Sequence, residues 1–257
     1  MADQDLLAER RGPILILRLN RPAARNALSL SLRRRLAADI ASADRDEALR
    51  AVVIAGSDTV FSAGGDIKEF ASLAASEAAS QESQRVWRTM PELTIPIIAA
   101  VEGLALGGGA ELALHADIIV AGETALFAFP EVTLGILPGN GGTQRFPRLV
   151  GKVLAMRYLL TGERFTAAQA LAMGMLSEVV PAGEALDRAL AIADRIAAMP
   201  PLAVRRIKNV VSNGADLPLD AALSLERLGF AALQRTEDHA EAARAFAEKR
   251  APRFAGR

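Results

Sequence analysis

Three short runs of Val, Ile and Ala, each followed by glycine, constrain the fold of this chain most strongly. They are RAVVIAG at residues 50–56, IPIIAAVEG at 95–103 and ADIIVAG at 116–122. Compact apolar runs of this length are typical of strands that are buried on both faces of a sheet, and segments with helical spacing separate them. The sequence therefore predicts a layered α/β fold with parallel strands.

A fourth strand and a first helix are expected before these runs. Residues 14–19, ILILRL, have the Ile and Leu content of a strand. The segment that follows has apolar residues about one helical turn apart, and Ser29 or Ser31 can cap its first turn. With 257 residues, the chain is long enough for one large domain, or for a domain with an appendage.

The character of the sequence changes after about Thr161. From there on the segments are rich in Ala, Leu, Arg and Glu with helical spacing, prolines separate several of them, and only residues 175–180 resemble a strand. This part is predicted to be a run of amphipathic helices. Such helices can pack on the core, on neighbouring subunits, or on both.

Composition and missing motifs exclude several classes of function. The 30 basic and 30 acidic residues balance, so no overall field attracts nucleic acid or an acidic membrane. Aromatic residues make up only 4%, and the absence of cysteine removes disulfides, thiolate nucleophiles and cysteine metal sites. Nucleophile-elbow and Walker A motifs are absent, and the dinucleotide fingerprint is matched only in part.

Histidine chemistry and membrane insertion are also unsupported by the sequence. His115 and Asp117 are two residues apart, so on a helix they do not face each other, and His239 is the only other histidine. We therefore expect His115 to be a packed or surface residue and expect no metal site. The most apolar region, residues 95–120, carries charged residues and falls short of the ~18 uninterrupted apolar residues of a membrane span. The N-terminus has no targeting pattern, so we expect a soluble, cytoplasmic protein.

Glycine-rich segments are the strongest functional signal in the chain. Three stand out, FSAGGDIKEF at residues 61–70, GLALGGGAEL at 103–112 and FPEVTLGILPGNGGTQ at 129–144. The first two each follow a strand candidate and lead into a helix, where backbone N–H groups are exposed and glycine lets a ligand approach closely. Two such N–H groups from different loops would form an oxyanion hole. Tight turns and close packing explain the glycines equally well.

Two carboxylates accompany these loops. Glu111 lies in the first turn of the helix after the second loop, and Glu131 follows Pro130 in the third. Two acids near one reacting centre can act as base and acid, as they also do in glycosidases, although the few aromatic residues argue against a sugar substrate. Alternatively, Glu111 is a helix-dipole partner and Glu131 a solvated loop acid. The residues thus indicate an enzyme with an oxyanion hole and a carboxylate pair, with its substrate undetermined.

The three loop segments resemble, in order and spacing, the signature segments of the enoyl-CoA hydratase/isomerase (crotonase) superfamily. The segments LNRPAARNAL at residues 19–28 and AFAEKRAPRF at 245–254 resemble the ends of that family, so the resemblance covers nearly the whole chain. It implies an α/β fold, a crotonase-like spiral of repeated ββα units over residues 1–195 that contains an acyl-CoA site. Residues 196–257 would form a C-terminal helical oligomerisation region, in a homotrimer or a hexamer made of two trimers.

The resemblance also implies a role for particular residues. The backbone N–H groups of Gly65 and Gly108 would form the oxyanion hole, Glu111 and Glu131 would be catalytic, and Gly139 would help to place the water. Position 65 is glycine where many hydratases have alanine, which keeps the donor and adds flexibility. The residues expected to line the coenzyme A path are Ala24, Arg25, Ala63, Asp66, Ile67, Lys68 and, as a weaker assignment, Lys249.

Dual glutamates favour hydration of a trans-2-enoyl-CoA to the 3-hydroxyacyl-CoA, in fatty-acid β-oxidation or related acyl-CoA catabolism. Coenzyme A would be part of the substrate, and no separate cofactor, nucleic acid or membrane partner is expected. The alternatives are another reaction on this fold, such as Δ3–Δ2-enoyl-CoA isomerisation or a specialised acyl-CoA dehydration, and a non-catalytic RNA-binding or scaffold protein. The variable segment at residues 69–94 and the C-terminal helices are expected to line the acyl tail, whose identity the sequence leaves open.

Overall fold

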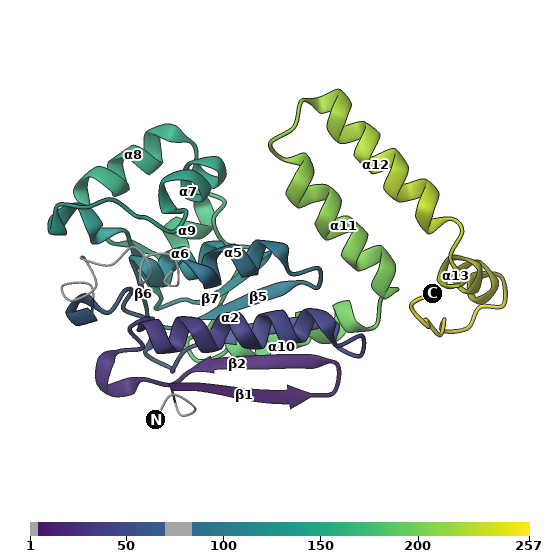
Figure 1. Ribbon diagram of the computed structural model, residues 1–257, viewed down its shortest axis with the longest axis horizontal. Coiled ribbons are helices and arrows are strands. Elements are labelled where there is room, and N and C mark those ends of the chain that lie inside the picture. Colours follow the sequence, from purple (N-terminus) through teal and green to yellow (C-terminus); the bar gives the residue numbers. More distant parts are fainter. Residues whose placement is uncertain (1–4, 70–83) are drawn as a thin grey trace.

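Two β-sheets form the centre of the molecule. The computed structural model describes residues 5–69 and 84–257 (Figure 1). A six-stranded sheet has the order β1-β2-β3-β5-β7-β10, and a four-stranded sheet has the order β4-β6-β8-β9. The strands of the large sheet are β1 (Leu6–Arg11), β2 (Ile14–Leu19), β3 (Ala51–Ala55), β5 (Ile97–Val101), β7 (Ile118–Gly122) and β10 (Glu178–Val180). Those of the small sheet are β4 (Val60–Ser62), β6 (Leu104–Leu106), β8 (Leu126–Ala128) and β9 (Phe165–Thr166).

From β3 to β8, consecutive strands alternate between the two sheets, which confirms the predicted spiral of strand pairs. In each of the pairs β3–β4, β5–β6 and β7–β8 the first strand joins the large sheet and the second joins the small one. Helix α6 (Gly108–Leu114) follows the second pair, and the 3₁₀ helix η2 (Pro130–Leu134) follows the third. Because β4, β6 and β8 run parallel, the segments that follow them emerge at one edge of the small sheet.

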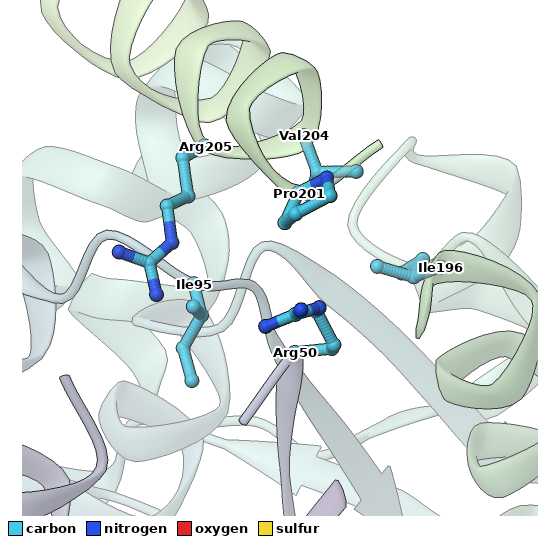
Figure 2. A pocket seen from close by; sticks show the side chains of 6 residues that line it. All are labelled: Arg50, Ile95, Ile196, Pro201, Val204 and Arg205. Atoms are coloured by element: carbon cyan, nitrogen blue, oxygen red, sulfur yellow. The ribbon is translucent and has the colours of Figure 1, made fainter. Parts of the chain in front are cut away.

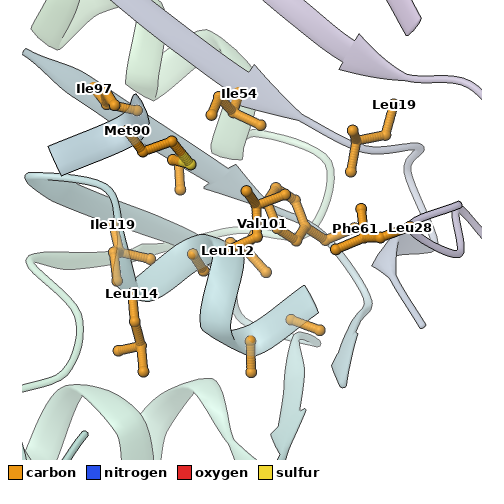
Figure 3. Packing of buried hydrophobic residues seen from close by; sticks show 14 of the residues in the cluster. Leu19, Leu28, Ile54, Phe61, Met90, Ile97, Val101, Leu112, Leu114 and Ile119 are labelled. Carbon is orange, nitrogen blue, oxygen red and sulfur yellow. The ribbon is translucent and has the colours of Figure 1, made fainter. Parts of the chain in front are cut away.

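The three Val/Ile-rich runs form β3, β5 and β7, and these strands are buried on both faces of the sheet, as predicted. In β3, Val52 and Ile54 face a core cluster with α2 (Leu30–Arg45), whereas Val53 packs in a second cluster with α10 (Ala185–Ala197). Figure 1 shows these two helices on opposite faces of the sheet. In the first cluster, side chains of the large sheet such as Val101 lie near Leu112 of α6 (Figure 3). Ser29 caps α2, because its Oγ accepts a hydrogen bond from the Leu32 N–H at 3.2 Å.

Several elements were not predicted from the sequence, including the four short strands of the small sheet and helix α5 (Arg85–Glu92). Strand β1 pairs antiparallel with β2, but only Leu6 at its start is buried, so it has no apolar alternation to reveal it. Helices α7 (Gly142–Val150) and α8 (Lys152–Thr161) were not predicted either. Helix α7 begins inside the glycine-rich third loop and contains a proline, both of which weaken a helical pattern.

A cluster of aromatic rings supports the chain around η2. Phe129 directly precedes η2, and its ring lies 4.9 Å from that of Phe146 in α7 and 6.3 Å from that of Phe165 in β9, between ring centroids. Phe127 and Tyr158 also contact Phe165. All five rings are buried, so the position of the loop after β8 is set by packing.

The last three helices extend away from the sheets. They are α11 (Pro201–Gly214), α12 (Leu219–Leu233) and α13 (Glu237–Ala247). Two other helices belong to the core: the short helix α9 (Ala167–Ala172), and α5 (Arg85–Glu92), which lies beside α2. Figure 1 shows α11 and α12 side by side, with α13 and the C-terminus beside the start of α11 and the end of α12. Lys208 of α11 ties the pair to the core, since its Nζ donates to the Ile95 carbonyl at 2.9 Å and to Asp117 Oδ2 at 2.8 Å.

A small hollow lies where α11 leaves the core, and it has no room for a water molecule (Figure 2). Its lining residues are Arg50, Ile95, Ile196, Pro201, Val204 and Arg205. It is therefore no candidate for a ligand site. Within residues 5–69 and 84–257, no helix combines the length and apolar character needed to span a membrane.

The packing of α2 on the sheet gives a prediction for stability. Leu36 is fully buried in the first core cluster, so Leu36→Ala should lower the free energy of unfolding by about 2–5 kcal/mol through lost burial and the cavity left behind. Leu160 in α8 is 63% exposed, and Leu160→Ala should change it by less than about 0.5 kcal/mol. Denaturant unfolding at one protein concentration measures both. Equal losses in the two variants would contradict this account of the core.

Candidate active site

Two glycine turns meet at the edge of the small sheet where β4 and β6 end. A Cβ placed on Gly64 would lie 2.7 Å from the Leu106 carbonyl oxygen, and one on Gly108 would lie 3.3 Å from the Gly65 nitrogen. Gly64 also has a φ of +100°, a conformation that L side chains rarely adopt. The backbone of the two turns is therefore in close contact, and the first of them has no room for a side chain.

The structure brings together the two N–H groups predicted to form an oxyanion hole. Gly65 follows the turn after β4, and Gly108 is the first residue of α6, whose N–H has no acceptor within the helix. Among the described residues, neither N–H donates a hydrogen bond. Two unpaired backbone donors in adjacent turns can bind a single oxygen atom that carries developing negative charge.

The carboxylate of Glu111 is buried in the first turn of α6 and has three donors. Its Oε1 accepts from the N–H groups of Asn140 at 2.7 Å and Gly142 at 2.9 Å, and its Oε2 accepts from Asn140 Nδ2 at 2.9 Å. A Cβ on Gly142 would lie 3.1 Å from Glu111 Oε1. Glu111 is thus held by the segment between η2 and α7, which excludes the interpretation that it is only a helix-dipole partner.

The carboxyl group of Glu131 has a different environment. It is buried in the first turn of η2, and its Oε2 has no hydrogen-bond partner in the described chain. The pKa of Glu131 is raised to about 7, mainly because of burial, with an opposing hydrogen bond from its own backbone N–H and a further rise from the charge of Glu111. Glu131 is therefore no solvated loop acid, and it can hold or release a proton near neutral pH.

Both glutamates lie beside the N-terminal end of α6. A Cβ on Gly107, the residue before the helix, would lie 2.9 Å from Glu131 Oε1, and Gly107 accepts the N–H of Glu111 at 2.9 Å. Gly107 has a φ of +51°, which L side chains rarely adopt, and a Cβ there would also displace the Glu131 carboxylate. A base and an acid that meet beside two oxygen-binding N–H groups can move protons to and from a carbonyl compound.

His115 is buried, which agrees with the expectation of a packed histidine. It also contacts the segment that holds Glu111. Its Nε2 lies 2.9 Å from the Asn140 carbonyl oxygen, and its ring lies 5.4 Å from that of Trp87, between centroids. Burial, followed by the charge of Arg145, lowers the pKa of His115 to about 4, against the effect of the Asn140 contact. Sequence analysis missed Asn140, because an asparagine in a glycine-rich turn has an ordinary structural explanation.

Gly139 lies at the exposed start of the same segment. A Cβ on it would meet no atom within 4 Å, and within the described chain its N–H donates no hydrogen bond. It is next to Asn140 and therefore close to Glu111. No group of three or more His, Asp or Glu side chains in the described ranges has a geometry suited to a metal ion.

The residues predicted to line the coenzyme A path lie in two places. Ala24 and Arg25 belong to the turn of η1 (Pro22–Ala24), and the Ala63 N–H donates to the Arg25 carbonyl at 3.0 Å, which joins this turn to the first glycine turn. Asp66 pairs with Arg21 at 3.1 Å. Ile67 and Lys68 are exposed beside it.

Lys249 lies apart from this group. It follows α13, which Figure 1 shows at the opposite end of the molecule from the turn at residues 22–25. Within one chain, the structure therefore does not bring Lys249 to the other predicted coenzyme A residues. Part of the segment expected to line the acyl tail, residues 70–83, is outside the described residues.

Comparisons with known proteins agree with this arrangement. A family model described as enoyl-CoA hydratase/isomerase matches residues 9–257. The 2,3-dehydroadipyl-CoA hydratase of Escherichia coli K12 is 42% identical over 98% of this chain and 99% of its own length. A probable enoyl-CoA hydratase of Mycobacterium bovis is 41% identical over the full length of both chains. The crystal structure of an enoyl-CoA hydratase from Bacillus anthracis has a TM-score of 0.93 at 35% identity and covers 99% of this chain and 100% of that one.

The raised pKa of Glu131 predicts a pH-dependent effect on stability. Glu131 ionises less readily in the folded protein than in the unfolded chain, so the folded state loses stability as pH rises from 4.5, the ordinary value, to about 7. Glu131→Gln avoids this loss. The difference in free energy of unfolding between Glu131→Gln and the wild type should therefore favour the variant more at pH 8 than at pH 5, by on the order of 2 kcal/mol.

Unfolding experiments at the two pH values test this difference. Glu123→Gln is a matched control, because Glu123 is exposed, and its effect should be the same at both pH values. If Glu131→Gln also has equal effects at pH 5 and pH 8, the Glu131 carboxyl is not perturbed as described.

Proposed function

The chain belongs to the enoyl-CoA hydratase/isomerase family, and we propose that it adds water to a trans-2-enoyl-CoA thioester to give the 3-hydroxyacyl-CoA. One observation carries this proposal. Two buried glutamates, Glu111 and Glu131, meet beside the unpaired N–H groups of Gly65 and Gly108. Hydration needs such a pair, because one group must activate the water and another must deliver a proton.

The two N–H groups bind the thioester oxygen in this mechanism. Hydrogen bonds from Gly65 and Gly108 draw electron density toward the oxygen, so the β-carbon becomes electrophilic and the enolate charge is stabilised. Neither contact uses a side chain, so glycine at position 65 supplies the donor as alanine would. Loss of one such donor lowers the rate about 10²–10³-fold in other enzymes.

The two glutamates divide the proton transfers. Glu111 holds the water and takes its proton as the oxygen attacks the β-carbon, and the three donors from residues 140–142 fix its direction. Glu131 contacts the same water from the other side and delivers a proton to the α-carbon, a role suited to a carboxyl group with a pKa of about 7. Water loses one proton to Glu111 and the α-carbon gains one from Glu131, so the substrate gains one water molecule, and transfer of a proton from Glu111 back to Glu131 restores both groups. No redox step or additional cofactor takes part. The N–H of Gly139 helps to place the water.

The coenzyme A part of the substrate would follow the exposed turns at residues 22–25 and 63–68. Arg25 and Lys68 are exposed cations there that can contact its phosphates. Because Lys249 is remote in the same chain, its predicted contact with coenzyme A would be made to the site of a neighbouring subunit. Arg25 and Lys68 both lie close in sequence to residues that form or contact the first glycine turn, which supports this path for coenzyme A.

The test is the loss of enoyl absorbance when the protein is mixed with trans-2-enoyl-CoA esters of increasing chain length. The relative from Escherichia coli is named for 2,3-dehydroadipyl-CoA, so this thioester belongs in the series. Glu111→Gln and Glu131→Gln should each lower kcat at least about 100-fold with a smaller change in KM, since both groups act in the transition state. Glu123→Gln, at an exposed glutamate, should leave kcat unchanged.

Two results would contradict the proposal. Absence of turnover on every enoyl-CoA would exclude hydration, and conversion of a 3-enoyl-CoA at a higher kcat/KM than any 2-enoyl-CoA would make isomerisation the main activity. Binding of RNA that weakens with salt, in the absence of turnover, would favour the non-catalytic alternative.

The proposal extends to assembly as a homotrimer or a hexamer of two trimers. The C-terminal helices expose several large apolar side chains, which is unusual for the surface of a monomer. They include Leu219, Leu228, Phe230 and Phe246, each at least 65% exposed. Burial of this surface between subunits would remove it from water.

Light scattering tests this extension. The mass in solution should be three or six times the 27.1 kDa of one chain, and Phe246→Asp, which places a charge on the exposed surface of α13, should shift it toward smaller species. Lys152→Asp, at an exposed charged residue of α8, is the control. A wild-type protein that stays monomeric would overturn this part of the proposal.

A further inference from the structure

Within the part of the chain that the structure describes, all donors to the Glu111 carboxylate come from one short segment, and two of the three come from one residue. Asn140 donates its backbone N–H to Oε1 and its side-chain Nδ2 to Oε2, and Gly142 donates the third bond. The direction of the Glu111 carboxylate is therefore set by the position of Asn140. A turn rich in glycine has little intrinsic rigidity, so Asn140 must be fixed by something else.

His115 supplies that constraint from the other end of α6. Its Nε2 lies 2.9 Å from the Asn140 carbonyl oxygen, and a carbonyl only accepts, so Nε2 carries the proton and donates it. Glu111 lies in the first turn of α6 and His115 is the residue that ends the helix. The segment at Asn140 is thus attached to both ends of the helix that carries the glutamate, through Glu111 and through His115.

The imidazole ring of His115 is itself held in place. It is buried, and Trp87 of α5 packs against it, with ring centroids 5.4 Å apart. The turn passes close to the ring at Gly141, whose φ of +108° is a conformation that L side chains rarely adopt. An exposed histidine that caps a carbonyl would contribute little, whereas a buried one with a single orientation can fix the turn.

We propose that His115 and Asn140 are positioning residues for the hydration reaction, which hold the Glu111 carboxylate in line with the attacking water. This inference rests on the proposed function and adds two side chains that act through Glu111. Neither residue contacts the thioester in this scheme. A displacement of the base by about 1 Å can lower a rate by about 10²-fold, so loss of either constraint should be visible in kcat.

Three variants separate the contributions. Asn140→Ala removes the Nδ2 donor and keeps the backbone N–H. His115→Phe keeps an aromatic ring against Trp87 and removes the donor to the Asn140 carbonyl. His115→Gln places an amide N–H at the same number of bonds from the backbone as Nε2, so it should restore most of the activity. His239→Gln, at the exposed histidine of α13, is the control for loss of a histidine.

Hydration of an enoyl-CoA should respond in kcat. We expect a decrease of about 10- to 100-fold in Asn140→Ala and His115→Phe, KM within about threefold of the wild type, and His115→Gln within about threefold of the wild type in both constants. Trp87 is the only tryptophan in the chain, so its fluorescence reports whether the packing around residue 115 is preserved in each variant.

A second reaction distinguishes positioning from general damage. Exchange of the α-hydrogen of a saturated acyl-CoA with deuterium from D₂O needs the oxyanion hole and Glu131 but not Glu111 in its proposed role. Asn140→Ala and His115→Phe should therefore keep the exchange rate within about threefold while hydration falls. Mass spectrometry of butyryl-CoA recovered from D₂O measures it.

Each outcome has one meaning. If hydration and exchange fall together, or if hydration is unchanged in Asn140→Ala and His115→Phe, the positioning role is wrong while the proposed function stands. If His115→Gln is as impaired as His115→Phe, the hydrogen bond to Asn140 is not the cause. If the wild type hydrates no enoyl-CoA, the proposed function itself fails, and the variants are not needed to show it.

Discussion

The close approach of two backbone turns, at Gly64–Gly65 and Gly107–Gly109, is the constraint on which the site depends. A Cβ on Gly109 would lie 2.4 Å from the Ser62 carbonyl oxygen, and one on Gly64 would lie 2.7 Å from that of Leu106. Only glycine permits this contact, and the contact in turn places the N–H groups of Gly65 and Gly108 side by side. These glycines lose more backbone entropy on folding than other residues would, and a site built from backbone atoms requires that loss.

Three buried glutamates near the strand ends show how one residue type takes different roles from its surroundings. Glu102 accepts from the N–H groups of Gly183 and Ala185 through Oε1, so it fixes the start of α10 against β5. Glu111 has three donors and a defined direction, whereas Glu131 has an oxygen without a partner and a pKa raised to about 7. The first is structural, and the other two have the contrasting environments that a base and an acid need.

The strands β2, β3, β5, β7 and β10 of the large sheet and the glycine turns could be predicted from sequence because their signals are local. The continuous apolar run of β3, which is buried at every position, and the glycines after β4 and β6 are visible in a few residues each. β1 could not be predicted, since its pairing with β2 rather than its own pattern makes it a strand. The link between His115 and Asn140 was also out of reach. It joins residues 25 positions apart, and nothing in their spacing indicates that a carbonyl of one faces the imidazole of the other.

Backbone and side-chain donors to Glu111 differ in how strongly the sequence restricts them. Almost any amino acid at position 140 would supply the backbone N–H. Position 142 must be glycine for its N–H to reach Glu111, because a Cβ there would lie 2.7 Å from Pro138 Cβ. The Nδ2 donor exists only with asparagine, and the anchor on its carbonyl exists only with a donor at residue 115. The fold thus places the base through the backbone N–H groups of residues 140 and 142, and the side chains of Asn140 and His115 add a further constraint. The second part is where chains with the same fold and the same two glutamates can differ in rate.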